Sequence, residues 1–97
     1  MRLPLDSYIV DTLMADLLGH DRAPSAFVVY LFLWRHTKGA GRGAVGASLQ
    51  SIATETGLSK SSVQNALGRL KRRRLISVRR DGPTAPCRYD VHEPWKR

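Results

Sequence analysis

The sequence predicts a mainly α-helical fold with a small β-hairpin, which is an α+β class, and three observations support this prediction. Apolar residues recur at helical spacing in four segments before residue 75. Serine, aspartate and glycine residues stand where these segments begin and end, as helix caps do. After residue 75 the pattern changes to alternation on both sides of a turn, which is typical of paired strands. At 97 residues and 42% hydrophobic residues, the chain is predicted to form a single domain over residues 1–97.

The first predicted helix covers residues 6–19. Asp6 or Ser7 stands where a cap is needed, and Gly19 stands where the helix can end. Asp11 and Asp16 occupy the polar side. The apolar side contains Ile9, Val10, Leu13, Met14, Leu17 and Leu18. We therefore expect an amphipathic N-terminal helix.

The second predicted helix covers residues 25–37, with Ser25 as its cap after Pro24. A strand is the competing interpretation, because β-branched and aromatic residues are frequent in this segment. Its length and capping residues favour a helix. It is apolar on every side, so more than one of its faces must be covered. Glycine-rich residues 39–46 then predict a hinge or turn, with a short strand at 42–45 as the alternative.

Two shorter helices are predicted within residues 48–73. Ser48 is placed to cap the first of them, which ends at Gly57, and Ser59 is placed to cap the second, residues 60–73. Their predicted buried residues are Ile52, Ala53, Val63, Ala66, Leu67 and Leu70.

The C-terminal part of the chain predicts a β-hairpin over residues 76–92. The segments "ISVRR" and "CRYDVH" both alternate, and "DGPTAP" between them has the composition of a turn.

Positive charge is concentrated outside the first helix. The formal net charge is +8, yet residues 1–21 hold one basic and four acidic residues, a balance of −3. The remaining fifteen basic and four acidic residues give residues 22–97 a balance of +11. A charge excess of this size is expected to bind a polyanion, and nucleic acid is the usual one.

The two short helices closely resemble a helix-turn-helix motif. Ala53 is small enough for a second helix to cross it closely, and Gly57 suits the positive φ of the turn. Leu58 is placed to fill the turn and Val63 to pack inward. Thr56 departs from the pattern, because an apolar residue usually precedes the glycine.

Three helices followed by a hairpin look like the winged helix-turn-helix domain of bacterial transcriptional regulators and of plasmid or phage replication initiators. The resemblance covers residues 25–92, and residues 6–19 form an extra helix outside it. It implies that helix 60–73 enters the DNA major groove. It also implies that the hairpin over residues 76–92, the wing, contacts the backbone or the minor groove.

The residue types on these elements suit both tasks. Gln64 and Asn65 can each pair with adenine through two hydrogen bonds in the major groove, and Gly68 permits close approach. Residues 71–74 point in directions 100° apart, so they cannot all face DNA, and the end of a helix is also where solvated cations are favourable. Ser59 is predicted first as a cap. The predicted DNA-binding residues are Ser59, Lys60, Ser61, Gln64, Asn65, Gly68, Arg69, Arg72, Arg79, Arg80 and Arg88.

Other chemistry is not indicated. His20, His36 and His92 lack metal-ligand spacing, and Cys87 is the single cysteine. We therefore expect no enzyme, cofactor, metal or small-molecule substrate. The absence of disulfides suits the cytoplasm. Residues 23–34, the longest nearly apolar stretch, are too short to span a bilayer, so no membrane partner is expected.

The sequence thus predicts a sequence-specific double-stranded DNA-binding protein that acts as a small transcriptional regulator. The alternatives are the DNA-binding domain of a replication initiator and a winged helix used for protein interaction. RNA binding is a further possibility, but it usually relies on aromatic stacking, and the exposed face has no aromatic residue. Residues 6–19 should pack against residues 25–37, within one chain or across a two-fold axis, away from the recognition helix. A homodimer through these two helices that binds an inverted repeat is expected.

Overall fold

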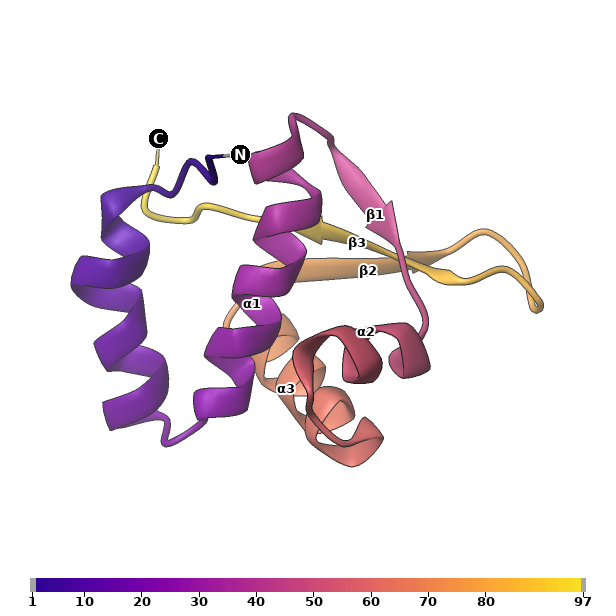
Figure 1. The fold of residues 1–97 in the computed structure, drawn as a ribbon, viewed down its shortest axis with the longest axis horizontal. Coiled ribbons are helices and arrows are strands. Elements are labelled where there is room, and N and C mark those ends of the chain that lie inside the picture. Colours follow the sequence, from indigo (N-terminus) through magenta and orange to yellow (C-terminus); the bar gives the residue numbers. More distant parts are fainter. Residues whose placement is uncertain (1, 97) are drawn as a thin grey trace.

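The computed structural model describes residues 2–96 and has the predicted α+β architecture (Figure 1). An N-terminal helix over residues 7–20 is followed by α1 (Pro24–His36), a 3-10 turn η3 (Lys38–Ala40), β1 (Ala44–Gly46), α2 (Leu49–Thr56), α3 (Lys60–Arg72), β2 (Ile76–Arg80) and β3 (Cys87–Val91). None of the helices in this described part has the length and apolar character that a bilayer crossing requires.

The three strands form an antiparallel sheet in the order β1-β3-β2. β2 and β3 form the predicted hairpin, with Ile76 opposite Val91 and Arg80 opposite Cys87. The sequence predicts a hinge or turn over residues 39–46, with a short strand at 42–45 as the alternative; the alternative is closer, because β1 pairs with β3 and adds a third strand. A strand of three residues in a segment with four glycines is too short to produce a recognisable alternating pattern in the sequence.

The N-terminal helix begins at the predicted cap but has an unexpected geometry. Asp6 Oδ1 accepts a hydrogen bond from the backbone N–H of Tyr8 at 2.9 Å, as an N-cap does. Most of the helix then has π-helical hydrogen bonding, in the segments η1 (Ile9–Leu13) and η2 (Asp16–His20). Gly19 does not end the helix, which continues to His20.

The two apolar rows of this helix have different surroundings. Ile9, Leu13 and Leu17 recur every four residues and are buried, whereas their neighbours Val10, Met14 and Leu18 are 47%, 36% and 41% exposed. The buried row packs into the common core beside α1 of the same chain (Figure 1). The predicted packing of the two helices is therefore confirmed, and it occurs within one chain.

Helix α1 lies in the middle of the fold, between the N-terminal helix on one side and α2, α3 and the sheet on the other (Figure 1). It begins with Pro24 at its first position and has Ala23 as its N-cap, so the predicted cap at Ser25 is wrong. Its apolar residues are covered on several sides, as predicted. The Tyr30 hydroxyl donates to the carbonyl of His92 at 2.9 Å, and burial raises the pKa of this phenol.

Helices α2 and α3 have the predicted caps and the predicted turn. Ser48 and Ser51 form a reciprocal capping box, and the side chain of Ser59 accepts the N–H of Ser62 at 3.1 Å. Gly57 joins the helices with a φ of 81°, a conformation that favours glycine. The predicted inward residues are all buried, namely Ile52, Ala53, Val63, Ala66, Leu67 and Leu70.

Helix α3 ends in a Schellman motif that lacks the usual glycine. The N–H of Leu75 donates to the carbonyl of Leu70 at 2.9 Å. The N–H of Arg74 donates to the carbonyl of Lys71 at 3.0 Å. Arg74 occupies the left-handed position of the motif, with a φ of 57°. Leu70 and Leu75 are both buried, which supplies the apolar contact of the motif.

The segment after β3 holds the N-terminal helix from the outside. The rings of Tyr8 and Trp95 stack with their centroids 4.5 Å apart, and Lys96 Nζ lies 3.3 Å from Asp6 Oδ2. The indole Nε1 of Trp34 also donates to the carbonyl of Pro4 at 2.7 Å. Both tryptophans therefore have packing roles.

Candidate nucleic-acid interface

The outward face of α3 is polar and is presented to solvent by the packing of its apolar stripe. Helical spacing places Ser61, Asn65, Gly68 and Arg72 opposite the buried stripe. Ser61, Asn65 and Arg72 are exposed, as is the neighbouring Gln64. A Cβ added at Gly68 would meet only the guanidinium of Arg72 within 4 Å, so the glycine leaves open space here.

One groove lies between α3 and the sheet, and we call it the wing-side groove. It has a volume of about 600 Å³. Lys60 and Lys71 border it on α3, and Arg80 borders it on β2. Part of its lining is apolar, including Val78 and Tyr89. Burial raises the pKa of Tyr89 to about 12, so its hydroxyl is neutral at physiological pH.

A second groove, of about 490 Å³, lies on the other flank of α3, and we call it the Arg22 groove. Gln64, Asn65, Gly68, Arg69 and Arg72 line it on α3, and residues 22–25 line it on the opposite side. Arg22, Arg69 and Arg72 give this lining three positive charges, and no acidic residue is among the lining residues. Sequence reasoning missed Arg22, which stands between two predicted helices without a motif around it.

The three predicted wing arginines do not lie on one face of the sheet. Arg79 pairs directly with Arg88 across the strands, and Arg80 pairs with Cys87. Because side chains alternate along a strand, Arg79 and Arg88 project from the face opposite to the wing-side groove. Like charges directly opposite each other destabilise a sheet. No carboxylate among residues 2–96 lies within ion-pair distance of either one, although Asp90, two residues after Arg88, is on the same face of the sheet.

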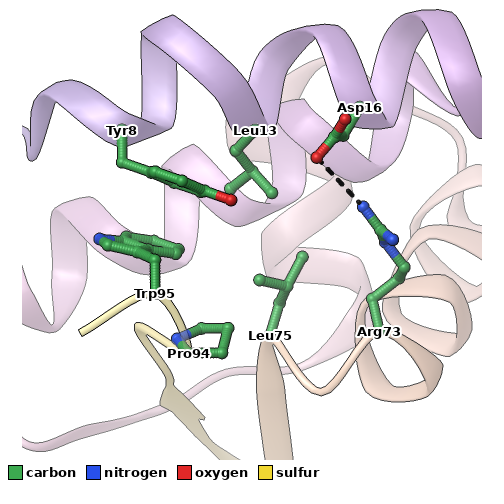
Figure 2. A pocket seen from close by; sticks show the side chains of 7 residues that line it. All are labelled: Tyr8, Leu13, Asp16, Arg73, Leu75, Pro94 and Trp95. Carbon is green, nitrogen blue, oxygen red and sulfur yellow. Dashed lines mark ion pairs between the residues drawn. The ribbon is translucent and has the colours of Figure 1, made fainter. Parts of the chain in front are cut away.

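The cations at the end of α3 point in different directions, as predicted. Lys71 borders the wing-side groove and Arg72 the Arg22 groove. Arg73 turns to the N-terminal helix, where its guanidinium lies 3.7 Å from Asp16 and 3.3 Å from Asp21 (Figure 2 shows the pair with Asp16). A hydrogen bond from His20 and the charge of Arg73 hold the pKa of Asp21 below its usual value. Arg73 is therefore occupied within the fold.

Figure 2 shows the hollow beside this ion pair, which has a volume of about 260 Å³. Leu13, Leu75, Pro94 and the stacked rings of Tyr8 and Trp95 form its apolar walls. It lies at the joint between the N-terminal helix and the C-terminal segment, away from the outward face of α3.

The serines at the start of α3 bond mainly to one another. Ser59 Oγ accepts the backbone N–H of Ser62 and lies 3.2 Å from the hydroxyl of Ser61 and 3.0 Å from that of Ser62. Ser59 thus acts as a helix cap in the structure. Lys60 beside it is exposed. In the part of the chain that the structure describes, no group of three His, Cys, Asp or Glu residues is arranged to hold a metal ion.

A family model for a helix-turn-helix domain matches residues 23–76, which is more than half of the chain. No curated protein and no solved structure matches the chain. The matched range begins at the N-cap of α1 and ends with the first residue of β2, so it includes α1, α2, α3 and the turn at Gly57. A domain of this kind indicates DNA binding. The chain belongs to this helix-turn-helix domain family, and its three-helix core with a strand hairpin is a winged helix.

Proposed function

We propose that this protein binds double-stranded DNA sequence-specifically and acts as a small transcriptional regulator of the bacterial or phage type. The observation that supports this most strongly is the arrangement around α3. Its polar outward face is flanked by two grooves, and each groove is bordered by three cations. A duplex has the complementary pattern. Its major groove presents base edges that side chains can read, and a negatively charged phosphate backbone borders the groove on each side.

In this proposal α3 lies in the major groove. Gln64 and Asn65 read base edges, and Gly68 lets the helix backbone approach them. Arg80 reaches the backbone from the wing-side groove. Arg79 and Arg88 extend the wing toward the backbone or the adjacent minor groove from the other face of the sheet. Occupancy of an operator in the cytoplasm then blocks or recruits RNA polymerase.

A replication initiator remains the second candidate, since its DNA-binding domain would use the same face. A protein-interaction module is less well supported. A surface that binds another protein is expected to expose apolar anchors, whereas the outward face of α3 is polar. Selection of bound sequences from a random duplex library tests the proposal directly. We expect enrichment of one motif, and recovery of unrelated sequences would contradict sequence-specific binding. A reporter with that motif at its promoter, compared with a plasmid with it at its origin, separates the regulator from the initiator.

We further propose a homodimer through the N-terminal helix. The most exposed large apolar side chains of the described residues are Leu3, Leu5, Val10, Met14, Leu18 and Val28. Val10 and Leu18 are four residues on either side of Met14. An antiparallel pair of these helices therefore places Met14 against Met14 of the second copy and Val10 against its Leu18, which is a closed two-fold contact. Burying each such side chain contributes about 1.5–3 kcal/mol at most, so the row needs its apolar neighbours to form a stable interface.

Two substitutions on the same helix test the dimer. Met14→Asp puts a charge at the centre of the exposed row and should give a folded monomer, because Met14 is 36% exposed in one chain. Ala15→Asp adds the same charge one residue later and is the matched control that should remain dimeric. Leu13→Asp instead should unfold the chain, since Leu13 is buried at 3% exposure. Light scattering that finds a wild-type monomer at high concentration, both free and on DNA, would contradict the dimer.

A further inference from the structure

We infer that Arg22 is a phosphate-binding residue, which grips the DNA backbone on the side of α3 that lies away from the wing. This inference rests on the proposed function. It assigns a partner to the Arg22 groove, and it extends the interface to a residue outside the predicted recognition helix and wing.

The geometry of a duplex requires a second backbone contact surface. A helix that lies in a major groove about 12 Å wide has one phosphate strand on each side. The wing-side groove offers Lys60, Lys71 and Arg80 to one strand. The other strand meets the opposite flank of α3, which is the flank that the Arg22 groove follows.

The lining of the Arg22 groove suits a phosphate strand. Arg69 and Arg72 stand on its α3 side and Arg22 on its opposite side, so cations border both walls. Between them lies the hydroxyl of Ser25, which can donate a hydrogen bond to a phosphate oxygen. Arginine is well matched to this task, because its planar guanidinium can donate two parallel hydrogen bonds to one phosphate.

The fold gains little from an arginine at this position. Arg22 is exposed, forms no ion pair with the residues that the structure describes, and adopts a φ of 53°. That left-handed conformation is easier for glycine. A side chain that the backbone conformation disfavours and that makes no ion pair is free to contact a partner.

Arg74 is a matched control within the same chain. It is also an exposed arginine with a left-handed backbone, at a φ of 57°, but it borders neither groove. Replacement of either arginine by glycine removes one positive charge and relieves the same kind of backbone conformation. The two substitutions should therefore have similar effects on stability and different effects on DNA binding.

The test compares wild type, Arg22→Gly, Arg22→Gln and Arg74→Gly in urea unfolding and in anisotropy titrations with a mixed-sequence duplex at several salt concentrations. We expect both glycine variants to unfold at higher urea concentration than wild type. Arg22→Gly and Arg22→Gln should bind about ten-fold more weakly on every duplex, because a charge-assisted hydrogen bond is lost. Their plots of log affinity against log salt should be shallower by about 0.9, whereas Arg74→Gly should bind with the wild-type slope.

The inference is overturned if Arg22→Gln keeps the wild-type affinity and slope, or if Arg74→Gly loses as much of both as Arg22→Gly. Arg22→Gln retains the length of the side chain, so it decides the matter even if the glycine variant folds poorly. Failure of the proposed function gives a different result, since wild type itself would then show no salt-dependent binding to any duplex.

Discussion

The arrangement of cations around α3 predicts how steeply DNA binding falls with salt. In the proposed complex, six positive side chains that line the two grooves face the two DNA backbones, and they are Lys60, Lys71, Arg80, Arg22, Arg69 and Arg72. Each neutralised phosphate releases condensed counterions and contributes about −0.9 to the slope of log affinity against log salt. Six contacts therefore predict a slope of about −5. An increase in salt from roughly 50 to 200 mM should weaken binding by about a thousand-fold.

Contacts from the outer face of the wing would make this slope steeper. If Arg79 and Arg88 also reach the backbone, eight contacts predict a slope of about −7. A single residue change distinguishes the two cases, because Arg79→Ala makes the slope shallower by about 0.9 only in the second. Arg42→Ala is the matched control, since Arg42 is an exposed cation that lines neither groove.

Fluorescence anisotropy with a labelled duplex measures the affinity at each salt concentration. A slope near zero in the wild-type protein would refute the electrostatic reasoning as a whole. A steep slope that Arg42→Ala and Arg80→Ala reduce equally would show that net charge, and not the placement of cations around α3, determines binding.

Three further predictions concern reading, backbone strain and acidity. Gln64→Ala and Asn65→Ala should each weaken binding to the preferred site by about 1–3 kcal/mol and leave random duplex nearly unchanged, as competition binding would measure. Gly57→Ala should lower the free energy of unfolding in urea by about 1–2 kcal/mol; nothing lies within 4 Å of the added Cβ, so a larger loss would contradict a purely backbone effect. The folded-state pKa values of Asp6 and Asp21 lie below 3.8, so their stabilisation is complete above that pH and disappears as the pH falls through the folded values. Urea unfolding in acid should show this loss, and Asp6→Asn with Asp21→Asn should remove it.

The outward face of α3 was predictable because its signals are local. Ser48, Gly57 and Ser59 determine the helix boundaries, and the apolar stripe of α3 determines which side faces outward. The same helical spacing indicates that residues 71–74 diverge. Strand alternation in "ISVRR" likewise indicates that Arg79 and Arg80 project from opposite faces of the sheet.

The N-terminal part of the chain was less predictable, because its geometry depends on tertiary packing. Its six apolar residues fit one broad stripe in the sequence, yet α1 covers only the row that contains Leu13 and leaves the row that contains Met14 exposed. A π-helical hydrogen-bond pattern has no sequence periodicity that distinguishes it in so short a segment. Arg22 was missed for a related reason. Its positive φ could not be expected from the sequence, because glycine or asparagine normally occupies such a position.

The stacked pair of Tyr8 and Trp95 has a consequence for folding during synthesis. A ribosome that adds about 5–20 residues per second reaches Trp95 roughly 4–17 s after Tyr8. Ile9, Leu13 and Leu17 can bury themselves against α1 early in that interval. The outer side of the same helix, however, has neither its aromatic partner nor the ammonium of Lys96 until the wing has been made. The contacts of Tyr8 and Asp6 with the C-terminal segment are therefore among the last of the fold to form during synthesis.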